Sequence, residues 1–239
     1  MNIVVPMAGE GKRFVEQGFT DPKPLLRINN KSMIQLSIES LNLDGNYTFI
    51  VRSEHNKRYG LSSYLKSLVG QCNIIEVNKT TEGAACTVLL AERFINNSNP
   101  LMIVNSDQYI RWNSSNFLEE MSLDYLDGCI LSFANNSPKW SYLLLDDNNL
   151  VTKVVEKEVV SDLATVGIYF WKKGNEFVKS TQKMITKNIR TKGEFYVAPS
   201  YNEMIGEGKI VGHYPVDEMY GTGTPEDWKR FVSDFSKIV

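Results

Sequence analysis

Residues 3–14 read IVVPMAGEGKRF, and this segment is the most informative one for the fold class. It begins with a short β-branched apolar run, which is typical of a buried strand. Gly9 and Gly11 follow directly after the run, where two glycines so spaced let the backbone turn tightly and direct its N–H groups at an anion. A strand that leads into such a turn predicts an α/β sheet with a binding site beyond the carboxyl ends of its strands.

Strand and helix patterns alternate through the first half of the chain. The predicted strands are residues 3–5, 47–51, 73–77 and 101–104. The predicted helices are residues 32–43, 55–69, 83–95 and 115–123. Each helix follows a strand after a short link, so the pattern predicts a parallel sheet with helices on both faces.

The second half changes character, because its strands follow one another more closely. The predicted strands are residues 128–134, 141–145, 150–155, 164–171 and 210–214. The predicted helices are residues 175–187, residues 194–205 and a terminal helix that Thr224 caps with Pro225 at its first position. The fold class is therefore α/β, with a mixed, mostly parallel sheet and a small β extension. Repeats and linkers are lacking, so residues 1–239 are predicted to form a single domain.

Composition narrows the classes of partner. The chain has 239 residues, 26 Lys and Arg against 28 Asp and Glu, a net charge of −2 and 42% hydrophobic residues, as in ordinary soluble proteins. A near-neutral charge argues against binding to nucleic acid or an anionic membrane. The N-terminus has no basic leader and no stretch reaches eighteen apolar residues, so we expect a cytoplasmic protein.

Few residues could hold a soft metal ion. The sequence has three scattered cysteines and two histidines, His55 and His213, which exclude a disulfide framework, a CxxC knuckle and an HExxH pair. Any catalytic metal is then expected to be a hard cation on oxygen ligands, which points to Mg²⁺.

The glycine turn carries a cation. Arg13 can grip phosphate oxygens through two N–H groups at once. The segment lacks the GxxxxGK[ST] pattern of a P-loop, and Phe14 replaces the third glycine of a dinucleotide fingerprint. An ordinary turn with solvated Lys12 and Arg13 is the alternative interpretation.

Three further segments can each be explained either by a chemical role or by a simpler structural role. Pro22 and Pro24 stiffen the backbone around Lys23, whose ammonium is then presented in one direction, although a surface lysine between prolines is common. Asp107 follows the apolar run 101–104, where a carboxylate can hold Mg²⁺ on phosphates or simply form a turn. Residues 80–85 read TTEGAA and combine helix-start signals with small residues that admit a base or a phosphate.

Taken in order, the motifs resemble those of the sugar-phosphate nucleotidylyltransferases, or pyrophosphorylases. The segments that carry the resemblance are residues 9–14, residues 22–25, Asp107, Glu156-Lys157, Gly167-Ile168-Tyr169 and Gly223-Thr224-Pro225. The resemblance implies a Rossmann-like fold of the GT-A type and a single nucleotidylyltransferase domain, with residues 1–125 binding nucleotide and residues 126–239 binding the acceptor. Residues 81–89, 105–109 and 220–227 look most like the small capsule and surface-polymer enzymes, which include the CTP:phosphoglutamine cytidylyltransferases.

The resemblance implies an attack by an acceptor phosphate oxygen on the α-phosphorus of a nucleoside triphosphate, with release of pyrophosphate. It assigns catalysis to Arg13 and Lys23 and the Mg²⁺ ion to Asp107. It assigns nucleotide binding to Met7, Ala8, Gly9, Glu10, Gly11, Lys12, Thr81, Glu82, Gly83 and Ser106. It assigns acceptor binding to Glu156, Lys157, Gly167, Glu194 and Tyr196.

The chain departs from the family pattern at one position. Many members carry an aspartate two residues before the glycine of the GTP motif, as a second metal ligand, and Gly221 stands there. Either nucleotide phosphates and water complete the metal shell, or Asp217 or another nearby carboxylate substitutes. The glycine also hints at a wider acceptor pocket and an acceptor other than a hexose 1-phosphate.

The sequence therefore predicts a Mg²⁺-dependent nucleotidylyltransferase, with CTP favoured over UTP and dTTP, that acts on a small phosphorylated metabolite for surface polymers. A sugar 1-phosphate acceptor is the alternative within the class. A GT-A glycosyltransferase is an alternative of another class, but Asp107-Gln108-Tyr109 lacks the second carboxylate of a DxD cluster. A nucleotide-binding sensor is a third, which the joint presence of Arg13, Lys23 and Asp107 disfavours. Assembly into a homo-oligomer stays open.

Overall fold

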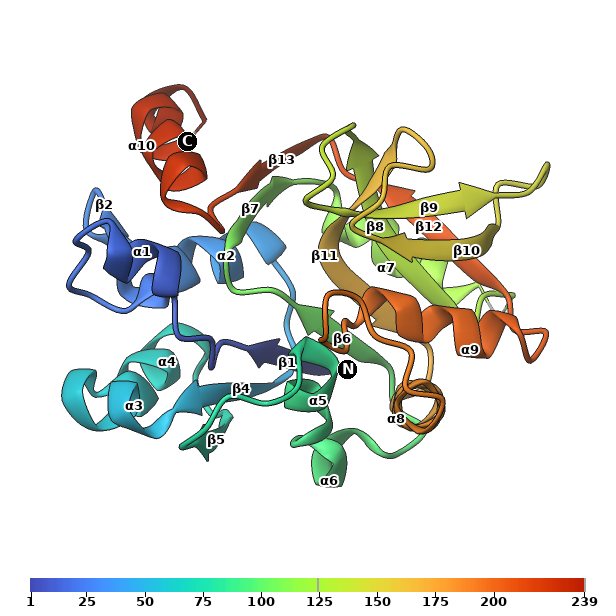
Figure 1. Ribbon diagram of the computed structural model, residues 1–239, viewed down its shortest axis with the longest axis horizontal. Helices are drawn as coiled ribbons and strands as arrows, with labels where there is room; N and C mark the ends of the chain where they lie inside the picture. Colours follow the sequence, from blue (N-terminus) through green and yellow to red (C-terminus); the bar gives the residue numbers. More distant parts are fainter. Residues whose placement is uncertain (124, 239) are drawn as a thin grey trace.

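A computed structural model describes residues 1–123 and 125–238 (Figure 1). The strands are β1 (Asn2–Pro6), β2 (Arg27–Ile28), β3 (Lys31–Ser32), β4 (Asn46–Arg52), β5 (Asn73–Val77), β6 (Leu101–Val104), β7 (Gln108–Arg111), β8 (Gly128–Ala134), β9 (Ser141–Leu145), β10 (Val151–Glu156), β11 (Leu163–Trp171), β12 (Val211–Pro215) and β13 (Glu218–Gly221). The helices are α1 (Lys12–Glu16), α2 (Met33–Leu41), α3 (Ser53–Tyr59), α4 (Leu61–Val69), α5 (Ala84–Leu89), α6 (Glu92–Ile95), α7 (Ser114–Ser122), α8 (Gly174–Thr186), α9 (Tyr201–Ile205) and α10 (Pro225–Ile238). Short 3₁₀ turns lie at η1 (Lys23–Leu25) and η2 (Ala198–Ser200).

The first half forms the predicted parallel sheet. Strand β1 lies between β4 and β6, and β5 extends the sheet beyond β4, all in parallel. Consecutive side chains of β1 point to opposite faces, so Val4 belongs to one hydrophobic core while Ile3 and Val5 belong to the other. Both faces are therefore covered, which explains why β1 is a continuous apolar run.

Strand β11 joins the second half to this sheet. It runs antiparallel to β6 on one side and to β8 on the other, and β9 and β10 form an antiparallel hairpin beyond it. Strand β12 adds to the free side of β8. These pairings confirm the α/β prediction of a mixed sheet with a β extension in the second half.

Three predicted helices differ in extent. The predicted helix 55–69 is two helices, because Gly60 adopts the left-handed conformation that ends α3. The predicted helix 83–95 is likewise divided into α5 and α6. The predicted helix 194–205 is shortened to α9, because the residues before it pair with another loop or form η2.

The ribbon of β7 and β13 was not predicted from the sequence. These strands pair antiparallel, with Gln108 opposite Gly221 and Arg111 opposite Glu218. The pairing brings the segment after β6 beside the segment before α10, which are far apart in the chain (Figure 1).

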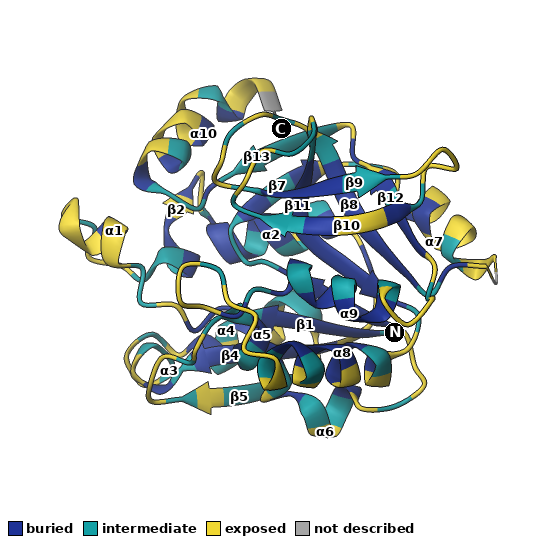
Figure 2. Cartoon of the chain, turned by 45° about the vertical axis from the view of Figure 1, so that its right-hand side comes forward, coloured by how far each residue is buried: buried dark blue, intermediate teal, exposed yellow. Residues whose placement is uncertain are grey.

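Helices cover the sheet on both faces, and its central strands are buried, whereas β5 and β10 are partly exposed (Figure 2). Helices α5, α8 and α9 contribute to the core that contains Val4, while α2, α4 and α7 contribute to the core that contains Ile3. A third core packs Trp228, Phe231 and Phe235 of α10 around Phe14 of α1. Among the described residues, helices with the length and apolar character of a membrane span are lacking.

Candidate active site

Two cavities lie beyond the carboxyl ends of β1 and β6 and meet at a shared wall. The first, of about 510 Å³, lies between the glycine loop and residues 77–87. The second, of about 280 Å³, lies between that wall and the β9–β11 side of the sheet. The residues that line both cavities are Arg13, Lys23, Ala84, Asn105, Asp107 and Gly223.

Lys23 is oriented at this wall. It begins η1, with Pro22 before it and Pro24 within the turn, and its ammonium lies 5.8 Å from the centre of the Phe14 ring. The ammonium contacts the Asp107 carboxylate, and the two side chains are 20% and 25% exposed. A cation and a carboxylate are thus held together but remain reachable, as a phosphate-transfer site requires.

Asp107 lies in the link between β6 and β7. Three hydrogen bonds to other segments of the chain hold this link in place. The Asp107 carbonyl accepts a hydrogen bond from the Thr222 N–H at 2.9 Å, and the Asn105 N–H donates to the Gly167 carbonyl at 3.1 Å. The Ser37 hydroxyl of α2 donates to the Asn105 carbonyl at 3.2 Å.

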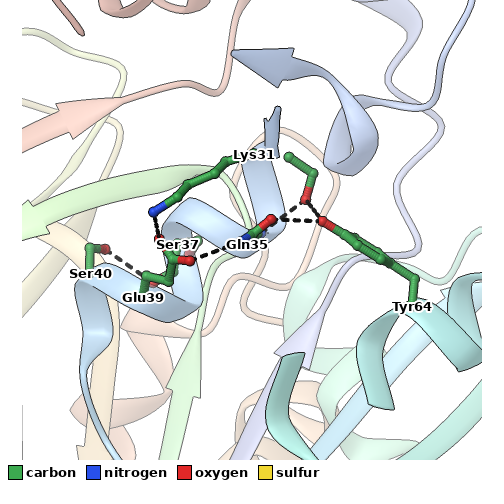
Figure 3. A network of polar contacts seen from close by, with 7 residues as sticks. Lys31, Gln35, Ser37, Glu39, Ser40 and Tyr64 are labelled. Atoms are coloured by element: carbon green, nitrogen blue, oxygen red, sulfur yellow. Dashed lines mark hydrogen bonds and ion pairs between the residues drawn. The ribbon is translucent and has the colours of Figure 1, made fainter. Parts of the chain in front are cut away.

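A polar network anchors α2 itself (Figure 3). Gln35 and Lys31 both donate to the Glu39 carboxylate, at 2.9 and 2.7 Å, and the Tyr64 hydroxyl of α4 donates to Gln35 at 3.1 Å. Because α2 is tied to α4 in this way, it offers Ser37 as a fixed support for the Asp107 link.

The donor set at Asp107 suits a hard cation that keeps water and phosphate ligands. The described residues contain no group of three or more His, Cys, Asp or Glu side chains that could enclose a metal ion. Among the described residues that line both cavities, Asp107 is the one with a carboxylate. Mg²⁺ commonly binds to proteins through one or two carboxylates together with substrate phosphates.

Side-chain contacts hold the glycine loop at the wall of the first cavity. Gly11 adopts the left-handed conformation at the start of α1, with φ of 64°. The Glu10 carboxylate lies 3.0 Å from Lys12, accepts from the Thr80 hydroxyl at 3.1 Å and lies 3.7 Å from Arg52. The hydrogen bond from Lys12 is the largest of the influences that lower the pKa of Glu10.

The opposite wall of the first cavity depends on Gly83. Phe195 donates its N–H to the Glu82 carbonyl at 2.8 Å, and Ala85 donates to the Phe195 carbonyl at 3.0 Å. A Cβ at Gly83 would lie 2.6 Å from the Phe195 nitrogen, so only glycine permits this approach. The hydroxyls of Thr81 and Thr87 bond to each other at 2.5 Å on the same wall.

The second cavity contains a buried carboxylate. Glu156 accepts a hydrogen bond from Ser141, and its other oxygen lies 3.7 Å from the Lys157 ammonium. Burial raises the pKa of Glu156. Lys157 lies 4.5 Å from the centre of the Tyr196 ring, and burial is the main cause that raises the pKa of Tyr196 to about 12.

Most residues singled out in the sequence lie on these walls. The first cavity is lined by Met7, Ala8, Gly9, Glu10, Gly11, Lys12, Thr81, Gly83 and Ser106. The second is lined by Glu156, Lys157, Gly167 and Tyr196.

Three candidates do not lie where the sequence analysis assigned them. Glu82 has a side chain that is 67% exposed and pairs with Arg190, while its carbonyl accepts a hydrogen bond from the Phe195 N–H. Glu194 lines the first cavity rather than the second. Asp217 precedes β13, where its N–H donates to the Arg111 carbonyl, so it stands at the opposite end of the ribbon from Gly221 and Asp107.

The sequence reasoning missed several residues of the second cavity, among them Gln108, Lys139, Trp140 and Asp227. Gln108 directly follows Asp107, and Asp227 follows the GTP motif, so both could have been proposed as site residues from their positions in the sequence. Lys139 and Trp140 lie in the link between β8 and β9, where no motif marks them.

The space at Gly221 is not the widening that the sequence suggested. A Cβ at Gly221 would lie 3.1 Å from Cη2 and 3.4 Å from Cζ2 of Trp140. The indole therefore packs against the position at which the family pattern has an aspartate.

Comparisons with known proteins agree with this architecture. The sequence model of the family described as "Nucleotidyl transferase" matches residues 3–195. A relative in Methanocaldococcus jannaschii, the bifunctional protein GlmU, is 25% identical over 216 residues, which are 89% of this chain and 48% of that protein. The chain thus spans about half the length of this curated relative.

Two solved structures share the fold. The nucleoside-diphosphate-sugar pyrophosphorylase of Vibrio cholerae has a TM-score of 0.86 at 24% identity, covering 97% of this chain and 99% of that one. The inositol-1-phosphate CTP transferase of T. maritima has a TM-score of 0.75 at 15% identity, covering 99% and 95%.

The resemblance drawn from the motifs is thereby confirmed at the level of the family. Since the match over residues 3–195 spans well over half of its length, the chain belongs to the nucleotidyl transferase family.

Proposed function

We propose that the chain transfers a nucleoside monophosphate from a nucleoside triphosphate to a small phosphorylated acceptor. The observation that carries this proposal is the contact of Lys23 with Asp107 at the wall between the two cavities. A triphosphate in the first cavity and an acceptor in the second would meet at that wall. One domain with a nucleotide-binding part, residues 1–125, and an acceptor-binding part, residues 126–239, agrees with this division.

The reaction forms one bond and breaks another. An acceptor phosphate oxygen attacks the α-phosphorus, and the bond from that phosphorus to the bridging oxygen breaks, so that pyrophosphate leaves with the electron pair. Catalysis of this kind depends on positioning and on neutralising charge. The glycine-loop amides and Arg13 hold the β- and γ-phosphates, while Lys23 neutralises the α-phosphate and the incoming oxygen.

Members of the family generally use a divalent metal ion, and we propose Mg²⁺, held by Asp107. The metal would neutralise phosphate charge when bound. Backbone groups near Ala8 and Gly83 would contact the base. Glu156, Lys157, Gly167 and Tyr196 would contact the acceptor, while the position of Glu194 favours a role on the nucleotide side.

The finer proposal is CTP as the donor and a capsule or surface-polymer metabolite as the acceptor, with phosphoglutamine as the leading candidate and a cytoplasmic setting. Residues 81–89, 105–109 and 220–227 support it, and one structure of the same fold is named a CTP transferase. A sugar 1-phosphate is the second acceptor class, because other structures of this fold are named for sugar nucleotides.

Pyrophosphate release tests the proposal. Purified protein with Mg²⁺ is incubated with CTP, UTP, dTTP, ATP or GTP and with hexose 1-phosphates, phosphocholine or phosphoglutamine. Release with one pair identifies both substrates. Absence of release with every pair, from protein that binds a triphosphate, would contradict the proposal and favour a nucleotide sensor. Sedimentation of the same sample determines whether the chain forms a homo-oligomer.

A further inference from the structure

Among the described residues that line the second cavity, Lys139 is the cationic side chain that the proposed chemistry does not use. The cavity is lined by four cationic side chains, Arg13, Lys23, Lys139 and Lys157. Arg13 and Lys23 stand at the wall shared with the first cavity, and Lys157 lies against Glu156 and Tyr196. Lys139 lines the second cavity but not the first, and it lies in the link between β8 and β9.

The Lys139 ammonium is held in one place. It donates to both oxygens of Asp227, at 2.8 and 2.9 Å, and lies 5.0 Å from the centre of the Trp140 ring. Asp227 belongs to the first turn of α10 and donates its own N–H to the Thr224 hydroxyl at 3.2 Å. The ion pair therefore joins the β8–β9 link to the start of α10 across this side of the cavity.

Trp140 makes this arrangement possible because Gly221 leaves room for its ring. The indole packs on the Gly221 backbone on one side and meets Phe133 edge-on at a centroid distance of 5.4 Å. The Trp140 carbonyl also accepts from the Lys157 N–H at 3.0 Å. The ring is thus a fixed wall beside which the Lys139 ammonium stands.

Lys139 can still bind a ligand. Its side chain is 43% exposed, and an ammonium has three donors, of which Asp227 takes two. Within residues 1–123 and 125–238 the third donor has no acceptor. A neutral group of the acceptor substrate would gain little from the Lys139 ammonium, whereas an anionic oxygen group would form a charge-assisted hydrogen bond with this ammonium.

We propose that Lys139 is a specificity-determining residue that binds a second anionic group of the acceptor, a carboxylate or a second phosphate, apart from the phosphate that reacts. Asp227 and Trp140 are positioning residues that hold its ammonium. This inference rests on the proposed function, since it takes the second cavity as the acceptor site.

Two matched pairs of ligands test it by titration calorimetry without any turnover. The first pair is 3-phosphoglycerate and glycerol 3-phosphate, which differ by a carboxylate in place of a hydroxymethyl group. The second pair is glucose 1,6-bisphosphate and glucose 1-phosphate, which differ by a second phosphate. We expect at least one doubly anionic ligand to bind about ten-fold more tightly than its partner, the scale of one charged hydrogen bond.

Variants identify the residue responsible. Lys139→Gln should abolish the preference, Lys139→Arg should keep much of it, and Asp227→Asn should reduce it. Lys179→Gln is the matched control, because Lys179 also pairs with a carboxylate, Glu207 at 2.8 Å, but lines neither cavity of the site. Nucleotide binding in the first cavity, measured in parallel, verifies that each variant is folded.

Equal binding within both pairs would overturn the inference, and so would a preference that survives in Lys139→Gln. The proposed function fails by a different readout, since a lack of pyrophosphate release leaves the binding preference measurable. If pyrophosphate is released at similar rates with both ligands of each pair, the proposed function stands and the proposed role of Lys139 is wrong.

Discussion

At the scale of single residues, the site depends on charges that are paired but not enclosed. Lys23 and Asp107 contact each other across 84 positions of sequence. Each side chain is about one-quarter exposed or less, so solvent screens the pair only partly and a phosphate can still approach. The pair itself is then a preorganised place for charge that develops during the reaction.

Substitution of Lys23 by Ala should lower kcat for pyrophosphate release by about 10²–10³-fold, the usual cost of losing one group that stabilises a transition state. The fold should persist, because the ammonium contacts Phe14 and Asp107 at a cavity wall. Steady-state kinetics with a thermal melt measures both. A variant with near-normal kcat would show that another group neutralises the α-phosphate.

Substitution of Asp107 by Asn should remove most activity together with its dependence on Mg²⁺, because an amide is a poor ligand for a hard dication. Titration of activity with Mg²⁺ measures the effect. Asp127→Asn is the matched control, since that carboxylate pairs with Lys209 and lines neither cavity. A Mg²⁺ curve in the Asp107 variant with an unchanged midpoint would place the metal ligand elsewhere.

Glu156 should contribute to function at the expense of stability. Burial raises its pKa in the folded state, so between the unfolded pKa and the raised value the native protein binds more protons than the unfolded chain. Stability is therefore lost as the pH rises through that window. Glu156→Gln should raise the melting temperature at pH 7–8, with the gain shrinking toward pH 4, while the KM for the acceptor rises. A lower melting temperature at pH 7 would show that the bonds to Ser141 and Lys157 outweigh burial.

At the scale of elements, loops that follow different strands are fixed to one another by backbone contacts. The β7–β13 ribbon brings Gly223 beside Asp107, where a Cβ would lie 3.0 Å from the carboxylate. The segment around Gly83 pairs with Phe195, and this joins the walls of the two cavities, since Glu194 lines the first and Tyr196 the second.

Substitution of Gly83 by Ala should separate these loops. The added Cβ would overlap the Phe195 backbone, and φ of 127° is unfavourable for alanine, so we expect a loss of about 1–3 kcal/mol in unfolding free energy together with weaker nucleotide binding. Denaturant unfolding and nucleotide titration measure the two effects. Gly9→Ala is the control for stability, because a Cβ there meets no atom within 4 Å. Equal stability of the two variants would contradict the role of the Gly83 contact.

At the scale of the whole molecule, one sheet positions both cavities. Strand β6 pairs with β1 on one side and with β11 on the other, so the strands that support the first and the second cavity are hydrogen-bonded neighbours (Figure 1). A ligand at the shared wall contacts residues from both parts of the chain and should stabilise them together.

A nucleoside triphosphate with Mg²⁺ at a hundred times its Kd should therefore raise the melting temperature by about 5–10 °C. This follows from about 2.7 kcal/mol of linkage and about 2–4 °C per kcal/mol for a chain of this size. The shift should be a single transition by calorimetry. The corresponding nucleoside without phosphates is the control, and an equal shift with it would show that the phosphate contacts of the glycine loop contribute nothing.

Features that depend on neighbouring residues could be predicted from the amino-acid sequence. The β-branched runs, the glycines at positions 9 and 11 and the prolines around Lys23 have local consequences, because backbone sterics and burial of alternate side chains act within a few residues. They sufficed to predict the α/β class, the strands β1, β4, β5 and β6, and the wall residues Arg13, Lys23 and Asp107.

Features that depend on contacts between distant segments became visible in the folded protein alone. The pairing of β7 with β13, the clamp of Phe195 on Gly83 and the indole of Trp140 over Gly221 leave no local pattern, because each partner alone is an ordinary turn or strand. The same reason explains why Asp217 and Glu82, which the sequence suggested for the site, do not line the cavities, and why Lys139 was not singled out. Asp217 and Glu82 were suggested because they are close in sequence to other candidates. Which charged side chains reach the cavities depends instead on the direction of β13 and on the packing of the Trp140 ring.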